Sequence, residues 1–264
     1  MNAYLMSDCT NCFGLCCVAL PFAKSADFPL SKDGGEPCRN LCSDNRCKIH
    51  DHLREKGFRG CVSYECFGAG QHVSQVIYKG NDWRNNSERA SEMFTVFPLI
   101  QQLHEMLWYL EQALSLKETH SFHSSLQDMY YETLRLTEKA PEEILELDIG
   151  AHRSKVIQLL LKTSEVYRKN HPKKRNKRVD YVGANLKGAD LRGFSFRGTL
   201  MIAADLSHAD LKKADFIGAD LRDADLSNAN LTGALFLTQS QLNSAKGNAY
   251  TKIPDYLKSP DHWG

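Results

Sequence analysis

The chain has 264 residues, nine of them cysteine, and its 33 Lys and Arg residues nearly balance its 32 Asp and Glu residues. A neutral chain creates no overall field that would attract nucleic acid or a membrane surface, and no apolar run approaches the roughly 20 residues of a membrane-spanning helix. The first residues also lack the pattern of a secretory signal, so we expect a cytoplasmic protein long enough for two domains.

All nine cysteines lie between residues 9 and 66. Disulfides rarely persist in the cytoplasm, so this concentration of thiols predicts metal or redox chemistry. Residues 1–80 are also rich in turn-forming residues and show little helical or strand periodicity. Because such a segment cannot easily build an apolar core, we predict a cysteine-rich module that bound metal stabilises.

The cysteine spacing begins with Cys9-x2-Cys12, followed by the adjacent pair Cys16 and Cys17. A Cys-x2-Cys pair lets two thiolates meet one ion across a tight turn, which is the usual first half of a zinc or iron site. Adjacent cysteines point in different directions and seldom bind the same ion. The pattern therefore favours two sites or one polynuclear cluster.

The arrangement CxxCxxxCC, followed by PC, CxIH and a final GC…C, resembles a bacterial cysteine-cluster family described as zinc- or iron-chelating. The resemblance covers residues 9–70 and implies eight metal ligands. These are Cys9, Cys12, Cys16, Cys17, Cys38, Cys47, Cys61 and Cys66. The extra thiol of Cys42 and the side chains of His50 and His52 leave open which eight of these eleven groups bind. Eight thiolates would suit two closed, structural zinc ions, or alternatively iron or an iron–sulfur cluster.

Residues 88–169 have the spacing of amphipathic helices. Large apolar residues recur at steps of three and four from Val96 to Leu114, and Pro98 is expected in the first turn of that helix. Three further helices are predicted, over residues 121–137, 139–147 and 153–169. The methionines and aromatic residues along these helices are expected to form a core.

A basic segment, residues 170–178, separates the helices from the last region of the chain. Residues 168–178 contain seven cationic residues in eleven but no aromatic residue that could stack on a base. We therefore interpret the segment as a solvated linker and do not expect contact with nucleic acid.

From residue 179 the sequence repeats every five residues. The central residue of each unit is large and apolar, and a small residue, nearly always Ala, stands two positions earlier. The central residues are Tyr181, Leu186, Leu191, Phe196, Met201, Leu206, Leu211, Phe216, Leu221, Leu226, Leu231 and Phe236. A period of five suits neither a helix nor a strand. It suits a four-sided coil of about three turns, in which the large and small residues point inward.

These repeats resemble the pentapeptide-repeat family, which implies a right-handed quadrilateral β-helix. The coil and its cap are expected over residues 179–247, with residues 237–247 closing the end of the coil and a tail at 248–264 folding back over it. The predicted fold is thus multidomain: a metal-stabilised cysteine-rich module, an α-helical middle and a C-terminal β-helix.

Some pentapeptide-repeat proteins mimic DNA and shield topoisomerases, and the coil has acidic residues that could serve this purpose. Seven aspartates precede central residues and are expected to point outward: Asp180, Asp190, Asp205, Asp210, Asp215, Asp220 and Asp225. Six cations on the same surface largely cancel their charge: Lys187, Arg192, Arg197, Lys212, Lys213 and Arg222. A short, nearly neutral coil is a poor imitation of a duplex.

The function that we predict is therefore that of a non-enzymatic metal-binding protein whose coil is an interaction scaffold for a protein partner. No catalytic residues are assigned, because no His or Glu dyad stands at a recognisable spacing. Two alternatives stay open at this point. One is a metal- or iron–sulfur-dependent enzyme or redox protein that docks a partner through the coil, and the other is the topoisomerase-protecting DNA mimic.

Overall fold

The computed structural model describes residues 3–171 and 180–264, and it divides into two compact units. The first unit contains Met1–Ser115 and Phe122–Leu160, and the second contains Leu116–Ser121 and Leu161–Gly264. The basic linker predicted at 170–178 lies almost wholly outside the described residues. The boundary predicted between the cysteine-rich and helical regions falls inside the first unit and stays a prediction.

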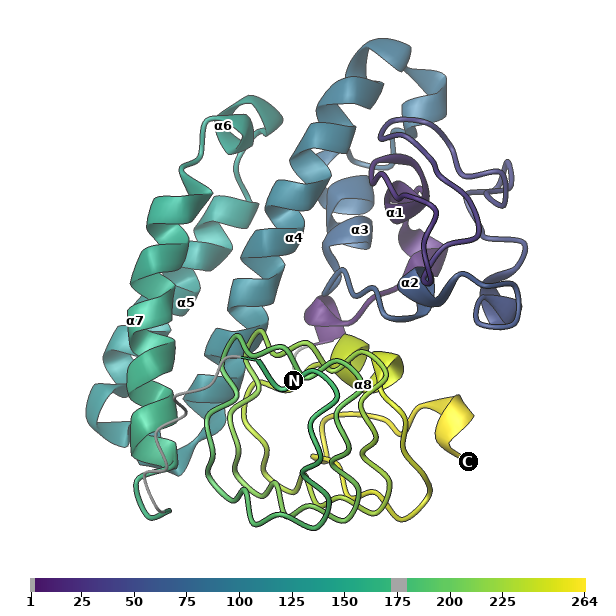
Figure 1. The fold of residues 1–264 in the computed structure, drawn as a ribbon. Coiled ribbons are helices and arrows are strands. Elements are labelled where there is room, and N and C mark those ends of the chain that lie inside the picture. Colours follow the sequence, from purple (N-terminus) through teal and green to yellow (C-terminus); the bar gives the residue numbers. More distant parts are fainter. Residues whose placement is uncertain (1–2, 172–179) are drawn as a thin grey trace. The chain divides into compact units, whose positions relative to one another are not determined.

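The helical middle region is confirmed. It contains α4 (Ser87–Ser115), α5 (His123–Thr137), α6 (Pro141–Leu145) and α7 (Ile149–Tyr167), as Figure 1 shows. Helix α4 packs against α5 and α6. Apolar residues of α4 that recur at the expected steps, such as Val96, Ile100, Leu103 and Leu107, have no exposed surface. They form the core of the first unit together with residues such as Leu126 of α5.

Two details of the predicted helices are wrong. Pro98 lies well inside α4 rather than in its first turn, because the helix already begins at Ser87. The missing N–H of this proline leaves one carbonyl of the preceding turn without its usual helical donor. The last helix begins at Ile149 rather than after residue 152, because the carboxylate of Asp148 accepts a 2.9 Å hydrogen bond from the backbone N–H of Ala151.

The cysteine-rich segment consists of loops joined by very short helices. They are α1 (Leu15–Val18), α2 (Arg59–Val62), α3 (Ala69–Gln71), a π-helical turn (His72–Ile77) and 3₁₀ turns at Ala3–Leu5, Cys9–Asn11, His50–His52 and Trp83–Asn85. Two isolated antiparallel bridges join Phe22 to Lys32 and Leu41 to Cys47. Most of this segment therefore has little regular backbone hydrogen bonding of its own.

A buried polar network fastens this segment to α4. The hydroxyl of Tyr4 lies 3.0 Å from Nε2 of His104, and Nδ1 of the same ring lies 2.8 Å from the carbonyl oxygen of Phe67. Burial lowers the pKa of His104 to about 3, and the neighbouring His72 adds to this effect. The imidazole is therefore neutral, so Nδ1–H donates to the carbonyl of Phe67 and Nε2 accepts from Tyr4.

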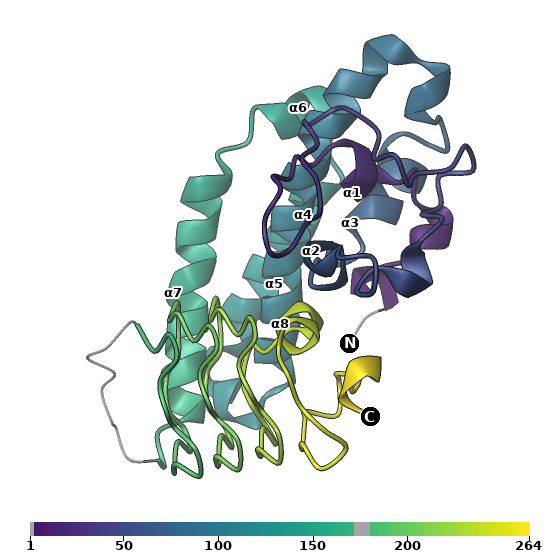
Figure 2. The ribbon, with the colours of Figure 1, turned by 45° about the vertical axis from the view of Figure 1, so that its right-hand side comes forward.

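The second unit is dominated by the repeat coil. Its backbone forms isolated parallel bridges between residues twenty positions apart, from Asp180 with Leu200 to Asp215 with Leu235. Twenty residues are four units of five, so each turn of the coil has four sides, and Figure 2 shows successive turns stacked along the coil. The bridges are single residue pairs, and the described part of the chain contains no longer strand.

The interior of the coil has the composition that the repeat predicts. Every central residue from Leu191 to Phe236 is buried, as is Ala at 204, 209, 214, 219, 224, 229 and 234. The rings of Phe196 and Phe216, one turn apart, stack with centroids 5.3 Å apart. The small residues leave room for these large side chains, which gives the coil a close-packed interior.

The end of the coil is closed by α8 (Gln239–Ser244) and the tail. The side-chain amide of Gln241 donates 2.8 Å hydrogen bonds to the carbonyls of Phe216 and Ala219. The bridge pattern also continues beyond the repeats, since Asn230 pairs with Lys252. Trp263 is buried and donates from its indole nitrogen to the carbonyl of Ala245. These groups satisfy backbone polar atoms that the last turn would otherwise expose.

Candidate metal centre and coil surface

The nine cysteines are all free thiols, and most of them are at least partly buried. The thiols of Cys12 and Cys66 crowd against the same glycine. A Cβ atom at Gly70 would lie 2.7 Å from Sγ of Cys12 and 3.8 Å from Sγ of Cys66. The hydroxyl of Ser7 lies 2.9 Å from Sγ of Cys66. Residues far apart in the sequence therefore place both thiols close to the same glycine.

Cys9 interacts electrostatically with Cys12 and Cys66. Burial raises the pKa of Cys12 to about 11, the backbone N–H groups of Leu15 and Gly14 oppose that rise, and the negative charges of Cys66 and Cys9 add to it. Burial raises the pKa of Cys9, and the charges of Cys66 and Cys17 add to the rise. Backbone N–H donors at a sulfur stabilise the thiolate, which is the form that binds metal.

A second group gathers around Cys38. Its backbone N–H donates a 2.9 Å hydrogen bond to the carbonyl of Cys17, and the bridge between Leu41 and Cys47 folds the following loop back. Burial raises the pKa of Cys61 to about 12, and the charges of Cys17, Cys38 and Cys47 contribute to the rise. Four cysteines from four segments are thus electrostatic neighbours.

The two groups meet at the adjacent cysteines. Sγ of Cys16 lies 3.9 Å from Sγ of Cys17. The hydrogen bond between them raises the pKa of Cys16, together with burial, and lowers that of Cys17. The other charges that act on Cys16 are those of Cys12 and Cys66, whereas the cation that acts on Cys17 is Lys32.

Lys32 is a buried cation that the sequence reasoning missed. Its Nζ donates to the carbonyls of Val18, Asp33 and Glu36 at 3.1, 2.7 and 2.9 Å. Burial lowers its pKa, while the charges of Cys38 and Cys17 act in the opposite direction. Because these partners are backbone carbonyls, no residue type in the sequence signals the burial of Lys32.

Cysteine thiols are suitable ligands for a thiophilic metal, but these thiols are not arranged around a common point. Within residues 3–171 and 180–264 no three His, Cys, Asp or Glu side chains surround a point that could hold a metal ion. The side chains of His50 and His52 are 63% and 61% exposed and face Asp51 and Glu55. Both histidines thus have acidic partners outside the two groups of thiols.

The aspartates on the surface of the coil accept hydrogen bonds from nearby backbone N–H groups. Nine Asp or Asn side chains that precede a central residue accept a hydrogen bond from the backbone N–H two positions later: Asp180, Asn185, Asp190, Asp205, Asp210, Asp215, Asp220, Asp225 and Asn230. Each bond caps a corner of the coil in the manner of an Asx turn. Asparagine does this as well as aspartate, so the position requires an acceptor rather than a charge.

The backbone conformation two positions after each central apolar residue explains why glycine is frequent there. The backbone there has positive φ, for example 61° at Gly183 and 57° at Lys213. This conformation is that of the third residue of a type II turn, and the N–H of Ala184 closes such a turn on the carbonyl of Tyr181. Glycine is frequent at this position because it adopts positive φ without strain.

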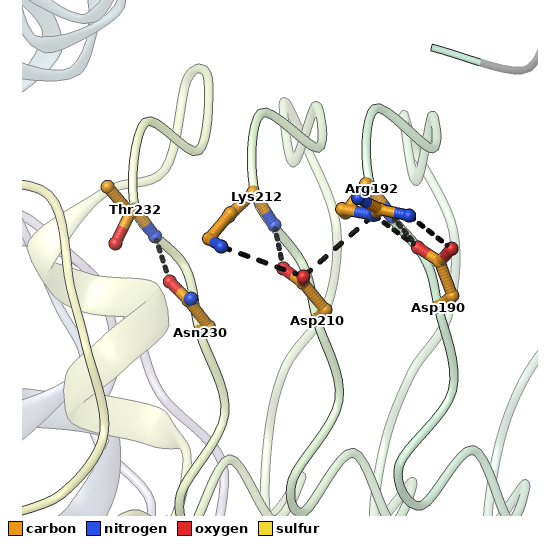
Figure 3. Close-up of polar contacts among 6 residues, drawn as sticks. All are labelled: Asp190, Arg192, Asp210, Lys212, Asn230 and Thr232. Atoms are coloured by element: carbon orange, nitrogen blue, oxygen red, sulfur yellow. Dashed lines mark hydrogen bonds and ion pairs between the residues drawn. The ribbon is translucent and has the colours of Figure 1, made fainter.

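One side of the coil carries ion pairs in a row, shown in Figure 3. Arg192 contacts Asp190 at 2.8 Å and reaches toward Asp210 of the next turn at 3.8 Å. Lys212 lies 3.8 Å from the same carboxylate, and the row ends with the neutral pair Asn230 and Thr232. Because cations pair with these aspartates, this side presents no continuous negative stripe.

Asp215 is not an outward residue, and the prediction that it is exposed is wrong. It has no exposed surface, and its carboxylate accepts a 2.6 Å hydrogen bond from the hydroxyl of Ser164 at the end of α7. Burial raises the pKa of Asp215, while the bonds from Ser164 and from the N–H of Ile217 oppose the rise. Arg168 donates to the same hydroxyl at 2.9 Å and to the carbonyl of Gly193. This side of the coil is covered by the last residues of α7.

Comparisons with known proteins agree with the repeat. The model of the family described as Pentapeptide repeats matches residues 182–216 and 201–236. The chain is also similar to the uncharacterised protein YybG of Bacillus subtilis (strain 168), with 62% identity over 264 residues that cover 98% of this chain and 95% of YybG.

Two solved pentapeptide repeat proteins match part of the chain. One comes from the thylakoid lumen of Arabidopsis thaliana, with 28% identity, a TM-score of 0.22, and coverage of 31% of this chain and 60% of that one. The other comes from Nostoc PCC 7120, with 29% identity, a TM-score of 0.14, and coverage of 31% and 78%. Among the described residues, no helix has both the length and the apolar character that crossing a membrane requires.

Proposed function

Since the chain belongs to the same family as the uncharacterised protein YybG and carries pentapeptide repeats at its C-terminal end, we propose that it is a cytoplasmic, non-enzymatic zinc-binding protein that presents its coil to a protein partner. The observation that supports the metal-binding part is the chemistry of eight thiols that five stretches of the chain contribute to one segment. They are free and most are partly buried, and those of Cys12 and Cys47 face backbone N–H donors.

Ionising a buried thiol without a bound metal is unfavourable, because the thiolate loses its hydration. Burial raises the pKa of Cys12 to about 11 and that of Cys61 to about 12, so both thiols are protonated at neutral pH. A divalent cation would reverse this effect, because a coordinated thiol loses its proton. Zinc ions would therefore add cross-links between loops that lack regular backbone pairing, and the residues would supply the thiolates.

The interaction part of the proposal rests on the surface of the coil. Its aspartates are used for turns and ion pairs, so the coil offers a rigid, nearly neutral face rather than an acidic rod. A rigid face whose polar groups are already positioned loses little conformational entropy on binding, which suits a protein partner. A duplex mimic would need unpaired negative charge at regular intervals.

The experiment that tests this proposal is elemental analysis of anaerobically purified protein together with its absorption spectrum. We expect zinc at about two ions per chain and no visible bands, since Zn²⁺ is a d¹⁰ ion. Iron with sulfur-to-metal charge-transfer bands would favour the redox alternative, and protein without stoichiometric metal would contradict the proposal. Protection of gyrase from a quinolone by the purified protein would favour the DNA mimic.

A further inference from the structure

The two ends of the repeat coil differ in how their backbone groups are satisfied. At the C-terminal end, α8 and the tail cover the last turn with hydrogen bonds. At the N-terminal end, the carbonyl of Leu200 in the second turn accepts a 2.7 Å hydrogen bond from the N–H of Tyr181 in the first. The equivalent carbonyl of the first turn belongs to Asp180, and no donor among residues 3–171 and 180–264 reaches it or the carbonyl of Val182. Residues 180–182 therefore form an open β-edge.

The apolar interior of the coil is also partly exposed at this end. Tyr181 and Leu186, the first two central residues, remain partly exposed, whereas every central residue from Leu191 to Phe236 is buried. A terminal turn of a solenoid needs a cover, because its interior and its backbone edge otherwise stay in contact with water. The first turn therefore offers both apolar surface and backbone acceptors to a binding partner.

The outer surface on the same side of the coil departs from the polar pattern of the repeat. Bridges from Asp180 to Leu200 and from Leu200 to Asp220 place these three residues in one column along the coil. Leu200 stands at a position that most units fill with Asp or Asn, and it is 47% exposed. Val182 is 49% exposed, and Ile202, its equivalent in the next turn, is partly exposed. These three apolar side chains form a patch that begins at the open edge.

The aspartates on this side of the coil differ in charge compensation. Asp220, two turns from the open edge, pairs with Arg222 at 2.7 Å. Asp180 is exposed and accepts a hydrogen bond from the N–H of Val182, but no cation within the described ranges pairs with its carboxylate. The open edge thus has one uncompensated negative charge beside the apolar patch. A cationic side chain placed opposite Asp180 on a neighbouring strand would be attracted to it.

We propose that the open edge binds an extended segment of a partner protein, which adds to the coil as a further β-strand; this rests on the proposed presentation of the coil to a protein partner. N–H groups of the segment donate to the carbonyls of Asp180 and Val182. Opposing residues of paired strands share a face, so the segment places Lys or Arg opposite Asp180, a large apolar residue inward over Tyr181 and a β-branched residue opposite Val182. A second copy paired through the same edge would bring no cation, so the charge favours a different chain.

Fluorescence anisotropy of the intact chain with a labelled probe peptide tests this recognition. The probe has consecutive Lys, Leu and Val residues between Ser and Thr residues. Asp180→Asn keeps the turn acceptor, as Asn185 shows, and should weaken binding about two- to fivefold. Leu200→Asp, which installs the usual residue of the repeat, should weaken it further, whereas the matched control Asp210→Asn should bind like the wild type. A probe with Glu in place of Lys should prefer Asp180→Asn. Absence of binding, or an equal loss in the control, would overturn the proposal.

Two further measurements separate the remaining outcomes. N-methylation of the backbone of the probe removes its donors but keeps its side chains, so it should abolish binding, and unchanged binding would overturn strand addition. In analytical ultracentrifugation, a dimer of the intact chain that Leu200→Asp dissociates would make a second copy the occupant and overturn the proposal. Elemental analysis of the same preparation tests the proposed metal binding separately. Protein without zinc that binds the probe would contradict that function alone, and zinc-loaded protein that does not bind it would overturn only the open-edge site.

Discussion

The repeat coil and the cysteine-rich segment achieve order in opposite ways. In the coil, a five-residue rule specifies an inward large residue, an inward small residue, a turn acceptor and a residue with positive φ, and each turn repeats the contacts of the last. In the cysteine-rich segment, regular backbone pairing is limited to short turns and two isolated bridges. Local sequence suffices for the first region, whereas the second depends on long-range contacts and, in our proposal, on metal.

The largest effect should come from the proposed ligands. Replacing Cys12 or Cys38 by Ser should expose residues 9–70 to proteolysis, because structural zinc contributes on the order of 10 kcal/mol to small zinc domains. The coil should stay resistant to the same protease. Limited proteolysis with mass spectrometry measures both regions in one sample. A resistant cysteine-rich segment in both variants would contradict its dependence on metal.

A smaller effect is expected from the interior of the coil. Truncation of Leu211 or Phe216 to Ala should lower the free energy of unfolding by about 2–5 kcal/mol, since both side chains have no exposed surface. Leu200, which is 47% exposed on the same coil, is the matched control and should change stability by less than about 1 kcal/mol. If denaturant titrations showed equal losses of unfolding free energy at inward and outward positions, the predicted difference between the two kinds of position would be wrong.

Asp215 is an exception within the coil, because it is buried whereas the other aspartates that precede central residues are at least partly exposed. Replacing it by Ala should lower the free energy of unfolding by roughly 2–3 kcal/mol, since the hydroxyl of Ser164 and the N–H of Ile217 lose their acceptor in a buried position. Its pKa in the folded chain is raised above the ordinary value of 3.8 by burial.

The folded chain consequently holds a proton on Asp215 in a pH range where the unfolded chain has lost it. The contribution of this group to stability falls as pH rises from about 4 through its folded pKa. Asp215→Asn should remove that part of the pH dependence. Superimposable pH–stability slopes of the wild type and Asp215→Asn over this range would contradict a buried, perturbed carboxylate.

The smallest effect concerns the corner aspartates. Asp210→Asn keeps the acceptor for the N–H of Lys212 and should change stability by less than about 0.5 kcal/mol, whereas Asp210→Ala should cost about 1 kcal/mol. Both variants remove the same charge, so their difference in thermal denaturation isolates the turn. Equal effects would indicate that charge, rather than the acceptor, matters at this position.

The repeat could be predicted from the sequence because its period, its small residues and its central residues are all local. The role of the aspartates could also have been found there, since Asn185 and Asn230 occupy equivalent positions without a charge. The burial of Asp215 could not, because it depends on Ser164, more than fifty positions earlier. The same limit holds for the cysteines: spacing predicts ligands, but their grouping depends on Gln71, Ser74 and other residues that bind distant loops.

The central claim is that metal orders the cysteine-rich segment while the coil is ordered by its own sequence. Hydrogen exchange of the intact chain, with and without a zinc chelator, measures both regions at once. We predict that chelation abolishes amide protection across residues 9–70 and leaves protection across residues 180–246 unchanged. Unchanged protection at 9–70 after complete metal removal, or a parallel loss in the coil, would contradict the account.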